Sequence, residues 1–410
     1  MPIKRLLPLC LSLGLFAPAA HAQFRTPAQQ QMLTNEDSLN NGVARAKTIV
    51  SGYGSAFYSR DFYNQTATAG LDRAVLFIGH QFNNKITFFS EMEVENAVAS
   101  SGARGEIAME QAFLKFNLNP RQYLVAGLFI PRIGILNENH LPVNFNGVQR
   151  PLVETMVIPA TWREIGVGFY GTSHHLPINY SIAVVNGLDA QNFVHGTGIM
   201  DGRAEGSLAA AGNLAVTASL QYHTGDFRFQ LSGYMGGTVG LRRTAADSLG
   251  LESGTFGTPI YLGEADVQWA SSGFSAKALG TYLYYPGADK VNLAFASNVA
   301  SGIYGAYGEF AYDWFWGRHK KPQFITFARY ELMDLNAVIP DNGLYDGTIK
   351  QDNLFLGISY LPIPNVVVKA DLRLLNTGAQ NPKLLINPPP NARPYQAQNT
   401  FLNLGIGYSF

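Results

Sequence analysis

Alternation of polar and apolar side chains is the dominant pattern along this chain. In residues 366–374, three charged residues, Lys369, Asp371 and Arg373, are each separated by one apolar position. In residues 85–96, Glu91 and Glu93 share a face that lies opposite apolar side chains. A period of two predicts β-strands whose two faces meet different surroundings. Because the polar face often carries full charges, water on one side and lipid on the other explain the pattern better than a soluble sandwich does.

Sixteen segments carry this alternation. They span residues 46–59, 72–82, 85–96, 106–118, 121–132, 162–172, 177–187, 213–223, 226–237, 259–270, 273–284, 302–314, 322–333, 351–361, 365–375 and 399–410. Short connections between these segments alternate with longer ones. The short connections are rich in Asn, Gly, Ser and Pro, as tight turns require, and the longest of the others are 133–161, 188–212 and 376–398. Short turns on one side and long loops on the other are typical of outer-membrane barrels. The predicted fold is therefore an all-β, transmembrane, antiparallel up-and-down barrel of about sixteen strands.

The two ends of the chain predict export to the outer membrane. Residues 1–22 have a basic start, a short apolar stretch and the sequence Ala20-His21-Ala22, as in a cleaved signal peptide. Residues 23–44 are polar and are expected to form a short periplasmic extension, either disordered or helical, before a barrel over 45–410. The last residues, Phe401 to Phe410, alternate strictly and resemble the terminal signal that the barrel-assembly machinery reads in porins. An even strand number places both ends of the barrel in the periplasm.

Composition removes several classes of function. Cys10, the single cysteine, leaves with the signal peptide, so the mature protein has no thiol for a disulfide, a nucleophile or a metal site. Loss of Lys4 and Arg5 leaves 29 − 2 = 27 basic against 29 acidic residues, which gives no basic footprint for nucleic acid. No His-Glu-x-x-His motif, nucleophile elbow or phosphate-binding loop occurs, so we expect no catalytic residue, metal or cofactor.

A distinctive stretch follows the fifth predicted strand. The Gly-rich fifth strand itself ends with Phe129-Ile-Pro131, and after it come the Arg150-Pro151 pair and the run Pro-Ala-Thr-Trp-Arg-Glu at 159–164; Asn186-Gly187 and the segment 198–203 come later. Here the chain resembles the phosphate-selective porins, the porin O/P-like family. The resemblance implies a sixteen-stranded, trimeric diffusion channel with an inward-folded loop that narrows the pore.

Charged residues of that loop are the candidates for the constriction. They are Arg132, Glu138, His140, Arg150, Glu154, Arg163 and Glu164. Opposed charges across a narrow aqueous gap would sort solutes by charge and dipole. The alternative is that they form salt bridges that fasten the loop to the inner wall, and both roles can coexist. Trp162 and Pro159 are expected to anchor the return of the loop.

Charged residues on the predicted inner face would line the pore. They are Glu91, Glu93, Glu95, Lys115, Arg228, Glu264, Asp266, Lys277, Glu309, Asp313, Arg329, Glu331, Lys369, Asp371 and Arg373. Six are basic and nine acidic. Channel selectivity follows the sign of the lining charges, so phosphate selectivity is not supported.

The sequence thus predicts a porin for passive diffusion of small polar solutes or ions. Expected partners are outer-membrane lipid, lipopolysaccharide, the barrel-assembly machinery and two further copies of the chain. Two alternatives remain open: an outer-membrane enzyme resembling a phospholipase, and a structural or adhesive barrel that works through its outer loops.

Overall fold

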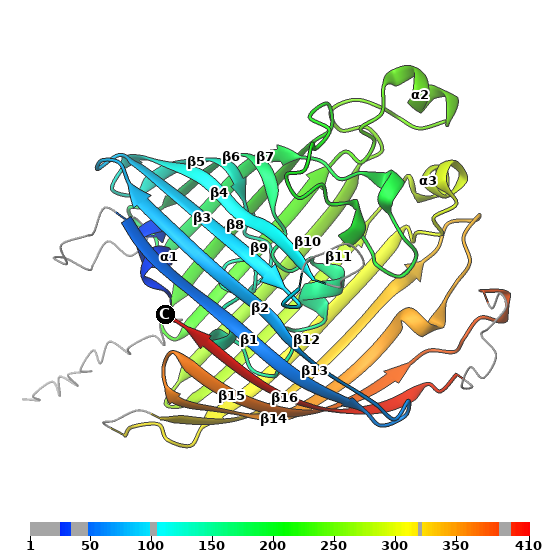
Figure 1. The fold of residues 1–410 in the computed structure, drawn as a ribbon. Helices are drawn as coiled ribbons and strands as arrows, with labels where there is room; N and C mark the ends of the chain where they lie inside the picture. Colours follow the sequence, from blue (N-terminus) through cyan, green and yellow to red (C-terminus); the bar gives the residue numbers. More distant parts are fainter. Residues whose placement is uncertain (1–24, 34–47, 99–104, 319–321, 385–394) are drawn as a thin grey trace, which may run out of the picture.

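The structure, a computed structural model, describes residues 25–33, 48–98, 105–318, 322–384 and 395–410. The predicted signal peptide, and residues 23–24 and 34–44 of the predicted extension, lie outside these ranges. Sixteen strands cover most of the described chain (Figure 1). They are β1 (Thr48–Asp61), β2 (Thr66–Gln81), β3 (Ile86–Glu95), β4 (Glu106–Asn119), β5 (Gln122–Phe129), β6 (Glu164–Thr172), β7 (Ile178–Asn186), β8 (Leu214–Thr224), β9 (Phe227–Gly236), β10 (Ile260–Ser271), β11 (Phe274–Tyr284), β12 (Gly302–Asp313), β13 (Gln323–Val338), β14 (Lys350–Ile363), β15 (Val366–Thr377) and β16 (Gln398–Ser409).

The strands form one closed antiparallel barrel. Each pairs with its neighbours in sequence, and β1 pairs with β16 to close the ring, with Tyr53 opposite Ser409. Closure gives the backbone groups of the two end strands partners, which a sheet in lipid needs because no water can satisfy an open edge. The predicted fold class and strand number are confirmed.

The two faces of the strands carry the predicted chemistry. In β15, Lys369 and Asp371 are buried in the barrel, whereas Val368 and Leu372, which flank this pair, are 48% and 43% exposed on the outside. In β12, Glu309 points inward and Phe310 outward. Alternation therefore separates a charged inner wall from an apolar outer wall, as a barrel in lipid requires.

One connection is shorter than the sequence suggested. The predicted second strand began at residue 72, but β2 begins at Thr66, and only Phe62–Gln65 separate it from β1. Residues 66–69 are exposed on both faces, so no apolar face exists there to reveal the strand. The remaining connections keep the predicted alternation of short turns and longer loops.

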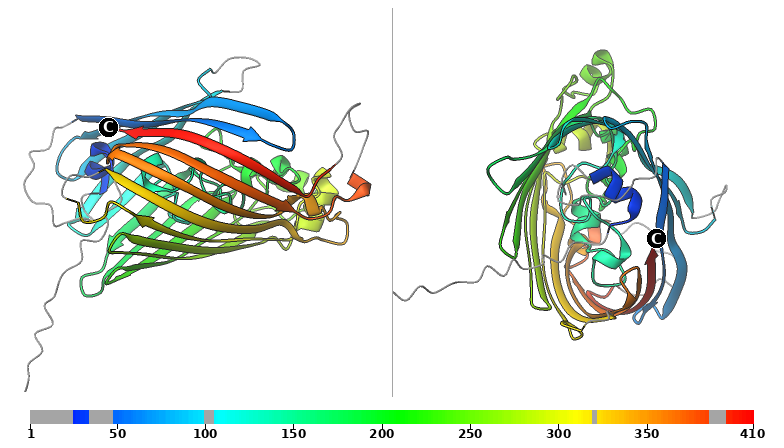
Figure 2. Two further views of the ribbon diagram at one scale, coloured as in Figure 1. Left: turned by 90° about the horizontal axis from the view of Figure 1, so that it is seen from below. Right: turned by 90° about the vertical axis from the view of Figure 1, so that its left-hand side faces the viewer.

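A short helix, α1 (Pro27–Leu33), lies inside one mouth of the barrel, at the end where Phe410 lies (Figure 2). It packs against β1, β2 and β3. The amide of Ala28 donates to the hydroxyl of Ser51 (3.3 Å), and the amine of Lys115 donates to the carbonyl of Met32. The sequence predicted a periplasmic extension here, either disordered or helical, and its described part includes this helix, which packs on the inner wall.

Two further helices, α2 (Arg243–Ser248) and α3 (Ala288–Phe295), belong to connections at the opposite end of the barrel (Figure 1). Short helical turns occur at η1 (Pro142–Asn144), η2 (Val153–Val157), η3 (Ala190–Asn192), η4 (Met200–Gly202), η5 (Gly347–Ile349) and η6 (Pro382–Leu384). Across the described ranges, every helix falls short of the length and apolar character that a membrane-crossing helix needs.

Candidate functional site: the inner wall and the segment folded against it

The connection between β5 and β6, residues 130–163, lies inside the barrel and first contacts β8 and β9. The side-chain amide of Gln230 donates to the carbonyl of Gly134 (3.0 Å). The carboxylate of Glu138 accepts from Arg228 (2.5 Å) and from Gln221 (3.0 Å). Burial raises the pKa of Glu138, but the guanidinium groups of Arg228 and Arg132 outweigh burial and bring the pKa down to about 2.

The connection then crosses to other parts of the wall. Nε2 of His140 lies 3.0 Å from a carboxylate oxygen of Glu91 on β3. Turn η1 packs against β1, β15 and β16. The amine of Lys369 donates to the carbonyl of Phe145 (2.7 Å), and Asp371 accepts from the amide of Val148 (2.7 Å). Between Glu138, which contacts β9, and Val148, the connection therefore contacts β3, β15 and β16.

Strands β12 and β13 hold the middle of the connection. Arg329 donates to the carbonyl of Asn146 (2.9 Å), and Glu309 accepts from the side-chain amide of Asn146 (2.9 Å). The amide of Val153 in η2 donates to Glu331 (3.1 Å). Backbone groups of an irregular segment need partners where water is scarce, and the charged wall supplies them here.

Glu154 organises the connection internally. Its carboxylate accepts from the amides of Ile135 (2.6 Å) and Leu136 (2.7 Å) and from the hydroxyl of Tyr307 on β12 (2.6 Å). Gly134 has φ of +77°, and a Cβ there would lie 2.8 Å from an oxygen of Glu154. Glycine at this position therefore lets the chain turn back over the carboxylate.

The return to β6 is built around Trp162, which is fully buried and packs against Tyr234, with ring centroids 4.7 Å apart and ring planes tilted by 36°. Its indole N–H donates to Glu164 (2.9 Å), which also accepts from Asn186 (2.6 Å). Arg163 pairs with Glu205 in the β7–β8 connection (2.5 Å). These contacts anchor the end of the segment.

The predicted site residues thus divide into groups. Those that join the folded segment to the wall are Glu138, His140, Glu154, Glu91, Glu309, Arg329, Lys369 and Asp371. Elsewhere, Glu93 pairs with Arg73 (3.0 Å), Arg132 lies over the ring of Tyr170, and Arg150 is half-buried.

Two predicted pore residues stand away from the segment. Asp313 accepts from the amides of Phe315 (3.0 Å) and Phe324 (3.1 Å), so it caps the β12–β13 turn. Arg373 donates to Asn353 (2.7 Å). All fifteen predicted inner-wall charges are buried or half-buried. Arg73, Glu110 and Asp334 join them and preserve the acidic excess.

Sequence reasoning missed Glu110, which is fully buried beside His140. Strict alternation from Lys115 would put residue 110 on the outer face. A β-bulge intervenes, because Glu91 pairs with Gln111 while Met92 pairs with Met109. The extra residue turns Glu110 inward. The sequence did offer one signal of this bulge, because strict alternation places the charged side chain of Glu110 on the face predicted to meet lipid.

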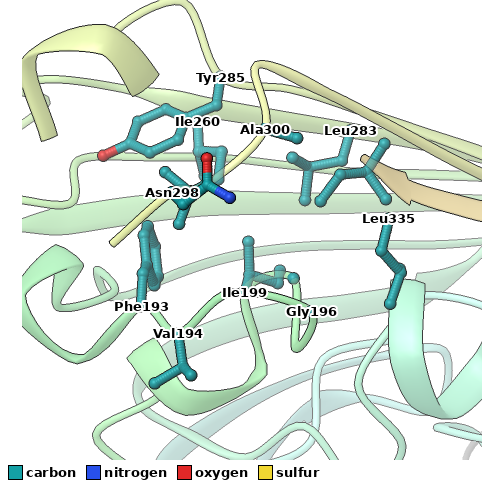
Figure 3. A pocket seen from close by; sticks show the side chains of 13 residues that line it. Phe193, Val194, Gly196, Ile199, Ile260, Leu283, Tyr285, Asn298, Ala300 and Leu335 are labelled. Carbon is teal, nitrogen blue, oxygen red and sulfur yellow. The ribbon is translucent and has the colours of Figure 1, made fainter. Parts of the chain in front are cut away.

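Among the cavities lined by described residues, two bear on the choice of a functional site. One is bounded by α1, the folded segment and the wall, with Arg25, Gln29, Arg132 and Glu138 among its lining. The other lies near the opposite rim, where Phe193 and Ile199 of the β7–β8 connection face Leu283 and Leu335 (Figure 3). The residues that line it are mainly apolar, so we assign it to the packing of the loops. The charged inner wall is the better candidate for function.

Comparison with known proteins supports the fold. No family model matches the sequence. An uncharacterised protein of Aquifex aeolicus (strain VF5) is 31% identical over 339 residues, which cover 78% of this chain and 74% of that protein.

Similar solved structures include Salmonella typhi OmpF in complex with daunomycin (TM-score 0.57, 11% identity, 88% of this chain and 97% of that one). An anion-selective porin from Comamonas acidovorans (0.53, 10%, 88% and 99%) and the outer membrane channel DcaP of Acinetobacter baumannii (0.52, 12%, 88% and 97%) are also similar. These identities establish the fold alone. A closed sixteen-stranded barrel of this kind, with an apolar outer wall, places the chain in the bacterial outer membrane.

Proposed function

The chain belongs to the same family as the Aquifex aeolicus protein, and we propose that its barrel is a porin for passive diffusion of small polar solutes or ions. The observation that carries the proposal is the charged inner wall, with Glu309, Arg329 and Lys369 buried inside a ring whose outer face is apolar. Sixteen strands enclose enough space for an aqueous channel.

The β5–β6 connection narrows this channel in our proposal. Its contacts with β9, β3, β15 and β13 support the idea, since a chain fastened to several sides of a barrel must occupy part of its cross-section. Arg150, which is half-buried, is the charge of this segment that would face passing solutes, because Arg132 is buried over the ring of Tyr170 and Glu138 and Glu154 are occupied by wall contacts.

The proposed channel is neutral or weakly cation-preferring. Acidic groups outnumber basic ones on the inner wall, and several of the basic groups, such as Arg329, are paired with carboxylates. Selectivity for phosphate would need unpaired cations in rows. The proposal therefore keeps the general porin role and leaves out phosphate selectivity.

Assembly is part of the proposal. We infer a homotrimer in contact with lipopolysaccharide and outer-membrane lipid, inserted by the barrel-assembly machinery through β16. Pairing of β16 with β1, extended by the amide of Phe410 donating to Gly52 (2.8 Å), makes β16 the strand that closes the ring. An unheated gel and native mass measurement would show the trimer.

Conductance in planar bilayers tests the channel. The refolded mature protein should produce discrete ion-conducting steps, and heat-unfolded protein should produce none. Absence of steps from correctly folded protein would refute the porin proposal. Hydrolysis of phospholipid by the same preparation would instead favour the enzyme alternative, and we propose that none occurs.

A further inference from the structure

Three metal-ligating side chains from distant parts of the sequence meet on the inner wall. Glu91 comes from β3, Glu110 from the bulge of β4 and His140 from the folded segment. Nε2 of His140 lies 3.0 Å from an oxygen of Glu91 and 3.9 Å from an oxygen of Glu110. One ligand atom from each residue lies within 4.8 Å of the other two, and all three residues are buried.

The hydrogen bonding of Glu110 is incomplete. Its side chain is fully buried, yet within the described part of the chain no donor reaches either carboxylate oxygen. Glu91, by contrast, accepts from Gln111 (2.7 Å). A buried carboxylate with no donor is costly unless a cation or a proton occupies the space beside it.

The surrounding arginines do not fill this need. Arg73 is engaged by Glu93 (3.0 Å) and Asp72 (3.2 Å). Arg150 weakens the negative field of the cluster, but among the described residues neither arginine forms an ion pair with Glu91 or Glu110. The two buried carboxylates beside the imidazole therefore have no ion-pair partner among the described arginines.

We propose that Glu91, Glu110 and His140 bind a divalent transition-metal cation, with Zn²⁺ the best fit. One imidazole and two carboxylates match the nitrogen and oxygen donors that Zn²⁺ takes, and a site with three protein ligands leaves a fourth position for water. With metal–ligand distances of about 2.0–2.2 Å, tetrahedral ligands lie about 3.4 Å apart, so small side-chain shifts would close the site.

The bound ion fastens the folded segment to the β3–β4 wall at residue 140. Wall contacts elsewhere on this segment are hydrogen bonds and ion pairs, such as those of Glu138 and Val148. A metal would add a coordinate link between two strands and the segment. This goes beyond the porin role and does not depend on it.

The test uses untagged mature protein that has been refolded in detergent, stripped with a chelator and then loaded with Zn²⁺. Zn²⁺ retained after desalting is measured by mass spectrometry, and affinity by calorimetry. We expect one Zn²⁺ per chain for the wild type and at least tenfold weaker binding for both Glu110→Gln and His140→Gln. Glu264→Gln is the control, because it neutralises a buried inner-wall carboxylate of β10 outside this cluster.

Circular dichroism and heat-modified gel mobility confirm that each variant is folded, and the two ligand variants serve as independent checks if one of them misfolds. The proposal is overturned if folded wild type retains no more Zn²⁺ than these variants, which would mean that protons occupy the cluster. It is also overturned if Glu264→Gln weakens binding equally. A barrel that conducts ions but binds no Zn²⁺ refutes only this inference, and one that binds Zn²⁺ but does not conduct refutes only the porin proposal.

Discussion

Glu309 of β12 and Arg329 of β13 lie opposite each other in the strand register, and their charged groups are 3.2 Å apart in the interior of the barrel. Arg329 also pairs with Glu331 (2.7 Å) and donates to the carbonyl of Asn146. One guanidinium thus connects two carboxylates of the wall with the segment that folds against it. Buried charges persist only when such partners replace the water they have lost.

Removal of this guanidinium should destabilise the barrel strongly. Arg329→Met leaves Glu309 and Glu331 buried without their cation, which costs about 3–5 kcal/mol in comparable cases. Urea unfolding in lipid vesicles, followed by tryptophan fluorescence, measures the loss. Arg243→Met is the control, because the Arg243 side chain is 88% exposed on α2 and should leave the midpoint unchanged. Equal midpoints for the two variants would contradict the role of Arg329.

Acidification should loosen the folded segment through Glu138. The pKa of this carboxyl falls from an ordinary 4.5 to about 2 in the folded protein. Its contribution is therefore complete above about pH 4.5 and is lost as the pH falls toward 2; the shift corresponds to roughly 3 kcal/mol. Between about pH 4.5 and 2, we expect the free energy of unfolding to fall by more in the wild type than in Glu138→Gln.

Unfolding midpoints of both proteins at pH 6, 4 and 2.5 provide the measurement. The difference between wild type and Glu138→Gln should shrink as the pH falls, because the wild-type carboxyl becomes neutral like the amide. A difference that stays constant from pH 6 to 2.5 would show that the ion pair with Arg228 contributes nothing to stability.

Selectivity should respond in opposite directions to two neighbouring charges of β15. Asp371→Asn removes an anion from the inner wall and should move the reversal potential in a salt gradient toward anion preference. Lys369→Gln should move it toward cation preference. Lys85→Gln changes an exposed charge in the β2–β3 turn and should shift the potential less than either. Shifts of the same sign for both β15 variants would exclude these residues from the conducting path.

The strands could be predicted because a barrel in lipid imposes one rule at each position. Outward side chains must be apolar and inward ones can be charged, so Lys369, Asp371 and Arg373 marked β15 without further knowledge. Where both faces meet water, as at residues 66–69, the same rule gave no signal and the start of β2 was misplaced.

The site was less accessible to this reasoning. Contacts such as that between Glu154 and Tyr307 join residues 153 positions apart, and no local pattern encodes them. A single bulge reversed the facing of Glu110, which removed it from the predicted inner wall. The sequence identified the charged residues of the folded segment but could not show that wall contacts occupy most of them.

The assignment of side chains to the outer and inner walls can be tested at Leu372, which is exposed on the outer wall between inward-facing Asp371 and Arg373. Leu372→Arg places a charge in lipid and should destabilise the barrel by about 2–4 kcal/mol near the bilayer midplane. Asp371→Arg introduces the same side chain one residue away on the water side. It forfeits the bonds of Asp371 to Val148 and Asn403, but it avoids any cost of entering lipid. Unfolding midpoints in bilayers of two thicknesses separate the effects, because only the penalty at residue 372 depends on its depth in the lipid. If thickness changes neither midpoint, residue 372 does not face lipid and the assignment of the two walls is wrong.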